Sequence, residues 1–417
     1  MAVTYTKRTE GGPPRLALVF VFVTALMDSI GFGIVLPVLP DLLMEITGED
    51  VSSAAVYGGW LLFIYAIMQF LMAPALGNLS DAYGRRPVLL ISITVLAINY
   101  VIMGLTETLW LLVLGRMISG AGAATFSTCN AYIADVTLPE ERAQYFGLMG
   151  AAFGMGFVIG PVIGGFLGEF GPRVPFFAAA VLLALNFLLG YFALPESHVP
   201  ENRRPFRASQ ANPINTFSRL SKFHVVFGLM GVMFLYNLSH HALPSVFSYY
   251  TIERYDWSAR DIGYSLGAIG LMMTIVQGFL IRFIIPWLGL RIAAVAGFTL
   301  MTVSFVGYAA ATEGWMLYVA MVPGALAAIA GPSINGIASA QVGADQQGEL
   351  QGGFASLMSL TSIISPPVMT MTFSLFTGSD AITYLPGAPF LLSAALTVLA
   401  LILLIRTTAR LPVANPA

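Results

Sequence analysis

Residues Leu16–Pro40, LALVFVFVTALMDSIGFGIVLPVLP, decide the fold, because the stretch is apolar over a length that crosses a lipid bilayer. It carries one charge, Asp28, near its middle. At about 1.5 Å per helical residue, Asp28 lies roughly 18 Å from Leu16, past the midpoint of a ~30 Å hydrocarbon layer. An ionised carboxylate there costs at least ~2.5 kcal/mol. We expect Asp28 to be protonated, paired or open to water, as a proton-coupled transporter requires; a permanent structural ion pair is the alternative.

The composition identifies the class of protein. Of 417 residues, 57% are hydrophobic and 10% are charged, and the mean hydropathy is +0.81. A soluble domain carries roughly a quarter charged residues, so the chain is predicted to be a polytopic α-helical membrane protein. No basic patch interleaved with aromatic residues indicates nucleic-acid binding. The single cysteine, Cys129, excludes an intrachain disulfide.

Six apolar spans, a polar stretch and six further apolar spans divide the chain. This plan predicts an all-α protein with 12 transmembrane helices in two six-helix bundles related as internal repeats. The expected domains are residues 1–194, a cytoplasmic linker at 195–222, and residues 223–417. The expected spans are 16–40, 54–76, 87–106, 108–134, 142–170 and 173–194, then 223–250, 261–285, 290–311, 314–341, 348–377 and 383–405.

Basic residues in the connections predict the orientation. Of the 19 Lys and Arg residues, 15 lie on the side that carries the termini and three lie in the opposite connections. Both termini are therefore expected in the cytoplasm. The remaining cation, Arg116, lies inside the fourth span at a depth that matches Asp28. A cavity between these two charges could load and release a proton, whereas a static pair would only hold two helices together.

Several uncharged residues also suit a pathway. Gly156, Gly160, Pro161, Gly164 and Gly165 in the fifth span predict close helix packing. The seventh span contains Asn237, His240 and His241, which suit a proton relay or a substrate contact, or alternatively an interhelical hydrogen bond. The same two interpretations apply to the amides of the other apolar spans, which include Gln69, Asn99, Gln277 and Asn335.

The loop Gly77–Leu90, GNLSDAYGRRPVLL, resembles the signature of the major facilitator superfamily, G-x-L-x-D-x-x-G-R-R/K. LGRMISGAG around Arg116 and GFVIGPVIGG at 156–165 resemble the family's fourth-span motif and its antiporter motif. DSIGFGIVLPVLPDLL, YAIMQFLMAPALGNLSD and DQQGELQGGFASL are similar to tetracycline and multidrug proton antiporters. The resemblance covers nearly the whole chain.

The resemblance implies alternating access, in which spans 1, 4, 7 and 10 line a central cavity. Asp28 corresponds to the first-span acid, and Arg116 to an arginine with a part in proton transfer. Tyr65 and Gln69 correspond to second-span cavity positions. The implied cytoplasmic gate consists of Gly77, Asp81, Gly84, Arg85 and Arg86, with Asp135 as its partner.

The sequence departs from the tetracycline exporters at several of their functional positions. They carry further acids in the third and ninth spans and a histidine in the eighth. Here the third span offers Asn99, the ninth is uncharged around Met301, and the eighth has Thr274 nearby. The loop RFIIPWLGLR between spans 8 and 9 keeps Gly289 but has no acid. These departures favour another aromatic or amphipathic substrate over tetracycline.

The preferred function is proton-coupled export of a small organic molecule by alternating access. The alternative is a facilitator or proton symporter of the same fold for a nutrient such as a sugar or organic acid. An enzyme is not expected, because no span holds a serine–histidine–acid or metal-ligand pattern. No cofactor and no metal are expected, since a proton gradient supplies the energy. The expected state is a monomer in a bacterial inner membrane.

Overall fold

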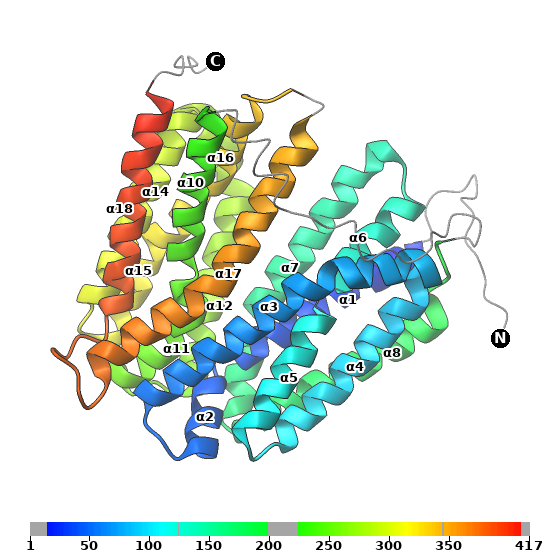
Figure 1. The fold of residues 1–417 in the computed structure, drawn as a ribbon, viewed down its shortest axis with the longest axis horizontal. Helices are drawn as coiled ribbons and strands as arrows, with labels where there is room; N and C mark the ends of the chain where they lie inside the picture. Colours follow the sequence, from blue (N-terminus) through cyan, green and yellow to red (C-terminus); the bar gives the residue numbers. More distant parts are fainter. Residues whose placement is uncertain (1–14, 124, 199–223, 344–345, 410–417) are drawn as a thin grey trace. The chain divides into compact units, whose positions relative to one another are not determined.

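The computed structural model describes residues 15–123, 125–198, 224–343 and 346–409, and these are mainly helical (Figure 1). Twelve of the described helical segments are long and apolar enough to cross a membrane. The prediction of an all-α protein with 12 membrane-spanning helices is confirmed. The chain separates into two compact units, 1–49 with 64–211 and 258–267, and 50–63 with 212–257 and 268–417. The division into two sequential bundles joined at 195–222 stays a prediction.

The first half of the chain supplies eight described helices. The third of them contributes its first part to the second unit and the rest to the first unit. The helices are α1 (Arg15–Val35), α2 (Leu39–Thr47), α3 (Val51–Tyr83), α4 (Arg85–Leu105), α5 (Leu109–Gly122), α6 (Thr125–Val136), α7 (Pro139–Gly168) and α8 (Val174–Ala193).

The described part of the second half contains α-helices interrupted by one π-helical and one 3₁₀ turn. They are α10 (His224–His240), α11 (Ala242–Tyr255), α12 (Ala259–Ile275), η3 (Val276–Leu280), α13 (Ile281–Leu288), α14 (Leu290–Ala310), α15 (Gly314–Leu326), η4 (Ala327–Ile329), α16 (Ala330–Ser339), α17 (Gln347–Thr377) and α18 (Ala388–Thr408).

The first span is shorter than expected. The predicted helix over 16–40 ends at Val35, and a separate helix, α2, begins at Leu39. Two prolines explain the break: Pro37 lacks the N–H that a continuing helix needs, and Pro40 is favoured in the first turn of a new one. The seventh span bends for the same reason. Pro244 has no N–H to donate to the His240 carbonyl, and α10 ends at His240 while α11 begins at Ala242.

Glycines bring α1 and α7 into close contact within the first unit. A Cβ atom on Gly156 would lie 2.6 Å from the Ser29 Cβ, and one on Gly160 would lie 2.8 Å from the Ile30 carbonyl oxygen. Gly164 meets the Ile34 backbone in the same way. Hydrogen at these positions lets the two backbones approach as small-residue helix pairs do in membranes.

A second face of α7 packs against the start of α12. Gly165 lies against the backbone of Ala259 and Gly263, and the Pro161 carbonyl lies against Gly263. Helix α7 therefore packs against both α1 and α12. Gly156, Gly160 and Gly164 are four residues apart and share one face, whereas Gly165 points about 100° away from Gly164.

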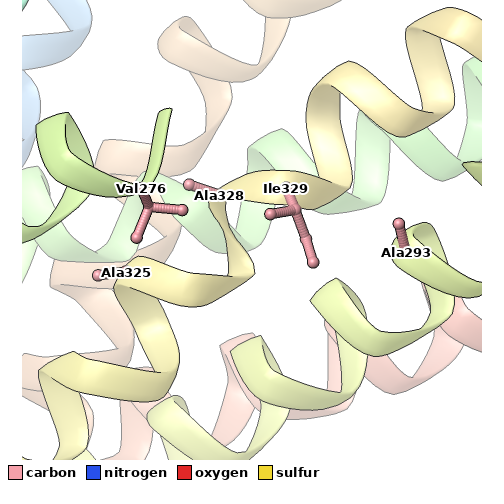
Figure 2. Close-up of a cluster of buried hydrophobic side chains, with 5 residues drawn as sticks. All are labelled: Val276, Ala293, Ala325, Ala328 and Ile329. Atoms are coloured by element: carbon pink, nitrogen blue, oxygen red, sulfur yellow. The ribbon is translucent and has the colours of Figure 1, made fainter. Parts of the chain in front are cut away.

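Aromatic rings fill the interior of the second unit. Phe390 packs edge-on against Tyr250 at 5.0 Å between ring centroids and lies 5.3 Å from Tyr308. The Tyr250 hydroxyl donates to the Tyr308 carbonyl at 2.6 Å, so the buried polar group is satisfied. A second cluster joins the π-helical and 3₁₀ turns, as Figure 2 shows. It consists of Val276, Ala293, Ala325, Ala328 and Ile329.

Replacing Gly160 with alanine is expected to destabilise the protein by about 1–3 kcal/mol, because the added methyl group overlaps the α1 backbone. Gly154 on the same helix has open space around its Cβ position, so Gly154→Ala is the matched control. Thermal unfolding of both purified variants in detergent checks the difference. Equal melting temperatures would contradict the close-packing interpretation.

Candidate functional site: buried charges and an inner loop network

Asp28 lies in the middle of α1, partly accessible and surrounded by helices of the first unit. Its charge acts on the hydroxyls of Tyr65 and Tyr100 and on the thiol of Cys129. The Tyr100 hydroxyl lies against α1 at Gly31, where a Cβ atom would be 2.8 Å away. Gly31 is three residues from Asp28 and shares its helix face. The carboxylate therefore lies among polar groups from α3, α4 and α6.

Arg116 of α5 lies near the same two tyrosines, Tyr65 and Tyr100. It is only 4% exposed, and its charge also acts on Tyr65 and Tyr100. The two tyrosines are thus within electrostatic range of both the Asp28 carboxyl group and the Arg116 guanidinium group. The structure brings together Asp28, Arg116 and Tyr65, three of the residues singled out from the sequence. Tyr100 was not singled out, although it lies beside Asn99 in a span that carries no charge between residues 87 and 106.

Asn99 positions the helix that carries Arg116. Its side-chain amide donates to the Ser119 hydroxyl at 2.7 Å and to the Gly115 carbonyl at 3.1 Å, and the residue is buried. Gly120, one turn beyond Arg116, lies directly against the Tyr65 backbone. The structure therefore places Asn99 between α4 and α5, where it fixes Arg116 relative to Tyr65.

The loop between α3 and α4 forms an ionic network. Gly84 has a φ of 105°, which favours glycine, and it reverses the chain between the two helices. The Arg85 side chain pairs with Asp81, meets Asp135 of α6 at 3.1 Å and donates to the Ser80 hydroxyl at 2.5 Å. The Ser80 hydroxyl donates in turn to the Gly77 carbonyl at 2.9 Å. The Gly77, Asp81, Gly84, Arg85 and Asp135 positions thus lie together, whereas the Arg86 side chain donates to the Tyr191 carbonyl at 2.8 Å.

Glu196 completes this network and was not expected from the sequence, which assigned it to the linker. Its carboxylate is 1% exposed and accepts hydrogen bonds from the backbone N–H groups of Arg85 and Arg86 at 2.9 and 3.2 Å. These N–H groups open α4 and have no partner within that helix, so the carboxylate acts as a cap from a distant segment. The only available signal was an acid directly after the sixth span.

Two further residues after the sixth span reach Asp135. The Ser197 hydroxyl donates to its carboxylate at 3.1 Å, and the His198 Nδ1 lies 3.7 Å from the same oxygen. The described start of the expected linker is therefore fastened to α4 and α6. The rest of that linker, residues 199–222, lies outside the described residues.

The histidines of the seventh span lie in the second unit at the bend between α10 and α11. The His240 ring stacks on Tyr236 at 5.8 Å, and the His241 Nε2 lies 3.2 Å from the Ser362 hydroxyl of α17. The two rings therefore have different partners. Asn237 is buried and donates to the Met233 carbonyl of its own helix at 2.8 Å.

The remaining amides do not form one cluster. Asn335 of α16 pairs with Gln351 of α17 at 2.8 Å. Gln277 lies in the π-helical turn and is exposed. Gln69 is partly buried one turn after Tyr65. Of these three residues, Gln69 belongs to the unit that contains Asp28, as Asn99 does, and Gln277 and Asn335 belong to the second unit.

Replacing Glu196 with alanine is expected to cost about 1–3 kcal/mol, because two helix-terminal N–H groups lose a charged acceptor in a buried position. Glu107→Ala is the control, since Glu107 is exposed between α4 and α5. Thermal unfolding of the two variants in one detergent measures the difference. A Glu196 variant as stable as the Glu107 variant would show that the cap contributes nothing.

Comparison with known proteins identifies close relatives. Class C tetracycline resistance protein of Escherichia coli is 42% identical over 358 residues, covering 86% of this chain and 90% of that protein. Class D protein of Salmonella ordonez is 37% identical, covering 85% and 89%. The human organic anion transporter MFSD10 (TETRAN) has a crystal structure with a TM-score of 0.67 at 26% identity, covering 94% of this chain and 99% of that one.

The crystal structure of the nucleoside transporter NupG shares the fold, with a TM-score of 0.75 at 14% identity, covering 94% of this chain and 98% of that one. The family model described as Major Facilitator Superfamily matches residues 21–366. The motif at Gly77–Leu90, the 12 spans and these matches agree. The chain belongs to the Major Facilitator Superfamily, a family of membrane transporters and not of enzymes.

Proposed function

We propose that this protein is a proton-coupled antiporter that exports a tetracycline-like, polycyclic aromatic molecule. The observation that carries the proposal is the grouping of Asp28 and Arg116 around Tyr65 and Tyr100 inside the first unit. The relatives support export: tetracycline resistance proteins match most of the chain, with up to 42% identity among those compared. The third and ninth spans lack the acids of the tetracycline exporters and the eighth span lacks their histidine, but we give more weight to the similarity over most of the chain. The proposed substrate is therefore of the tetracycline class.

Asp28 is the proposed proton carrier. Its charge acts on two phenols and a thiol, and the charge of Arg116 acts on the same two phenols. Removal of water favours the protonated acid, and proximity of the guanidinium favours the ionised one. A change in hydration during the transport cycle therefore changes whether Asp28 holds a proton. Tyr65 and Tyr100 contribute hydroxyl groups that can donate to the ionised acid.

The inner loop network is proposed to close the cytoplasmic side. Arg85 is held by Asp81, Asp135 and Ser80, and Glu196 holds the start of α4. Such a network ties α3, α4 and α6 into one block, which suits rigid-body rocking. We also propose that the protein acts as a monomer in a bacterial inner membrane, with both termini in the cytoplasm, as the basic residues and the bacterial relatives indicate.

Replacing Asp28 with asparagine is expected to abolish uphill transport driven by a pH gradient, because the amide cannot carry a proton. The measurement is tetracycline accumulation in everted vesicles or proteoliposomes. Asp380→Asn, which removes an exposed acid from the connection before α18, is expected to keep wild-type transport. Undiminished gradient-driven transport by the Asp28 variant would refute the proposed role.

Substrate binding is expected to tighten as pH rises, because an ionised Asp28 has released the proton with which the substrate competes. In the Asp28→Asn variant, which imitates the protonated acid, affinity should not change with pH. Tetracycline binding to purified protein at two pH values, followed by fluorescence, measures both proteins. Equal pH dependence in the two would exclude Asp28 as the competing group.

A further inference from the structure

An arginine on the outside of α13 lies between exposed aromatic rings. The guanidinium carbon of Arg282 is 4.4 Å from the centroid of Phe279 and 5.2 Å from that of Phe283. Phe283 is 57% exposed and Trp287, on the same helix face, is 78% exposed. Residues at this helical spacing form one stripe along the helix: Phe279, Arg282, Phe283, Pro286 and Trp287. We call these five residues the Arg282 stripe.

The opposite side of the same helix is packed. Leu280, Ile284 and Leu288 contact the buried cluster that contains Val276 and Ile329. The π-helical turn at Val276–Leu280 inserts an extra residue per turn and so rotates the helix that follows. The Arg282 stripe therefore points away from the interior of its own unit.

The position of Arg282 makes an unpaired charge expensive. It lies within the apolar span Ala259–Leu288, six residues from its end, which corresponds to about 9 Å. Arginine inside a membrane span is costly unless its long side chain reaches the polar headgroups. Within the described ranges, no carboxylate pairs with Arg282 or with Arg291, which follows the Gly289 turn.

We propose that the Arg282 stripe, with Arg291, binds the phosphate of an anionic phospholipid in the leaflet where the span Ala259–Leu288 ends. Positive charge without a protein partner fits an anionic headgroup, and a headgroup-level Trp287 fits the interfacial preference of tryptophan. The two phenylalanine rings hold the guanidinium by cation–π contact and present it outward. This site is separate from Asp28 and independent of the proposed transport function.

The test measures lipid preference in the full-length protein. Purified protein in nanodiscs of phosphatidylcholine, alone or mixed with phosphatidylglycerol of the same acyl chains, is compared by lipid titration and native mass spectrometry. Wild type is expected to bind phosphatidylglycerol preferentially, and Arg282→Gln to lose roughly fivefold in that affinity. Arg406→Gln, which removes an exposed cation near the end of α18 without an aromatic stack, is the control and should keep it.

A second readout does not depend on the stability of the Arg282 variant. The fluorescence of Trp287 is obtained as the difference between wild type and Trp287→Phe. Brominated phosphatidylglycerol should quench this signal more strongly than brominated phosphatidylcholine does. Equal quenching by both lipids, or equal affinity loss in the Arg282 and Arg406 variants, would overturn the proposal. Competition by inorganic phosphate alone would reassign the site to a free anion. Loss of tetracycline transport in Arg282→Gln with unchanged lipid preference would place Arg282 on the substrate path instead.

Discussion

Ionised groups inside an apolar span are the constraint on which the rest of this structure depends. Asp28 and Arg116 would each be costly in hydrocarbon, so the chain must surround them with polar groups or water. It does so with Tyr65, Tyr100 and Cys129, taken from three other helices. The close contact of α1 with α7 and the Asn99 hydrogen bonds then fix these groups in place. The close helix packing therefore helps to keep Asp28 and Arg116 among polar groups.

The two halves of the chain use the same turn with different chemistry. Gly84 and Gly289 have similar backbone angles, with φ values of 105° and 75° and ψ values of 157° and 155°. After Gly84 comes Arg85, which pairs with Asp135, whereas after Gly289 comes Leu290, which packs on Gly336. The two turns share a backbone conformation, but the residue after the glycine makes an ionic contact in one half and an apolar contact in the other. Among the described residues, the ionic contact at this turn is found in the first half.

Periodicity and hydropathy predicted the 12 spans because membrane helices must satisfy their own backbone hydrogen bonds and be apolar throughout. The break at Pro37 was missed, since hydropathy does not register where a proline interrupts a helix. Asp28 and Arg116 could be found as charges in apolar spans. Glu196 could not, because its role depends on a contact with α4 more than a hundred residues earlier in the chain. Tyr100 resembles many membrane tyrosines until the fold places its hydroxyl against Gly31.

The carboxylate of Glu196 also decides where the polypeptide can be divided. Although the sixth span ends at Ala193, the residues through His198 are bonded to α4 and α6. A break after His198 keeps the Glu196 carboxylate on the same fragment as α4 and α6. A break directly after Ala193 separates the acid from the fragment that contains the start of α4. The segment that is bonded to the first unit therefore extends through His198, beyond the last residue of α8.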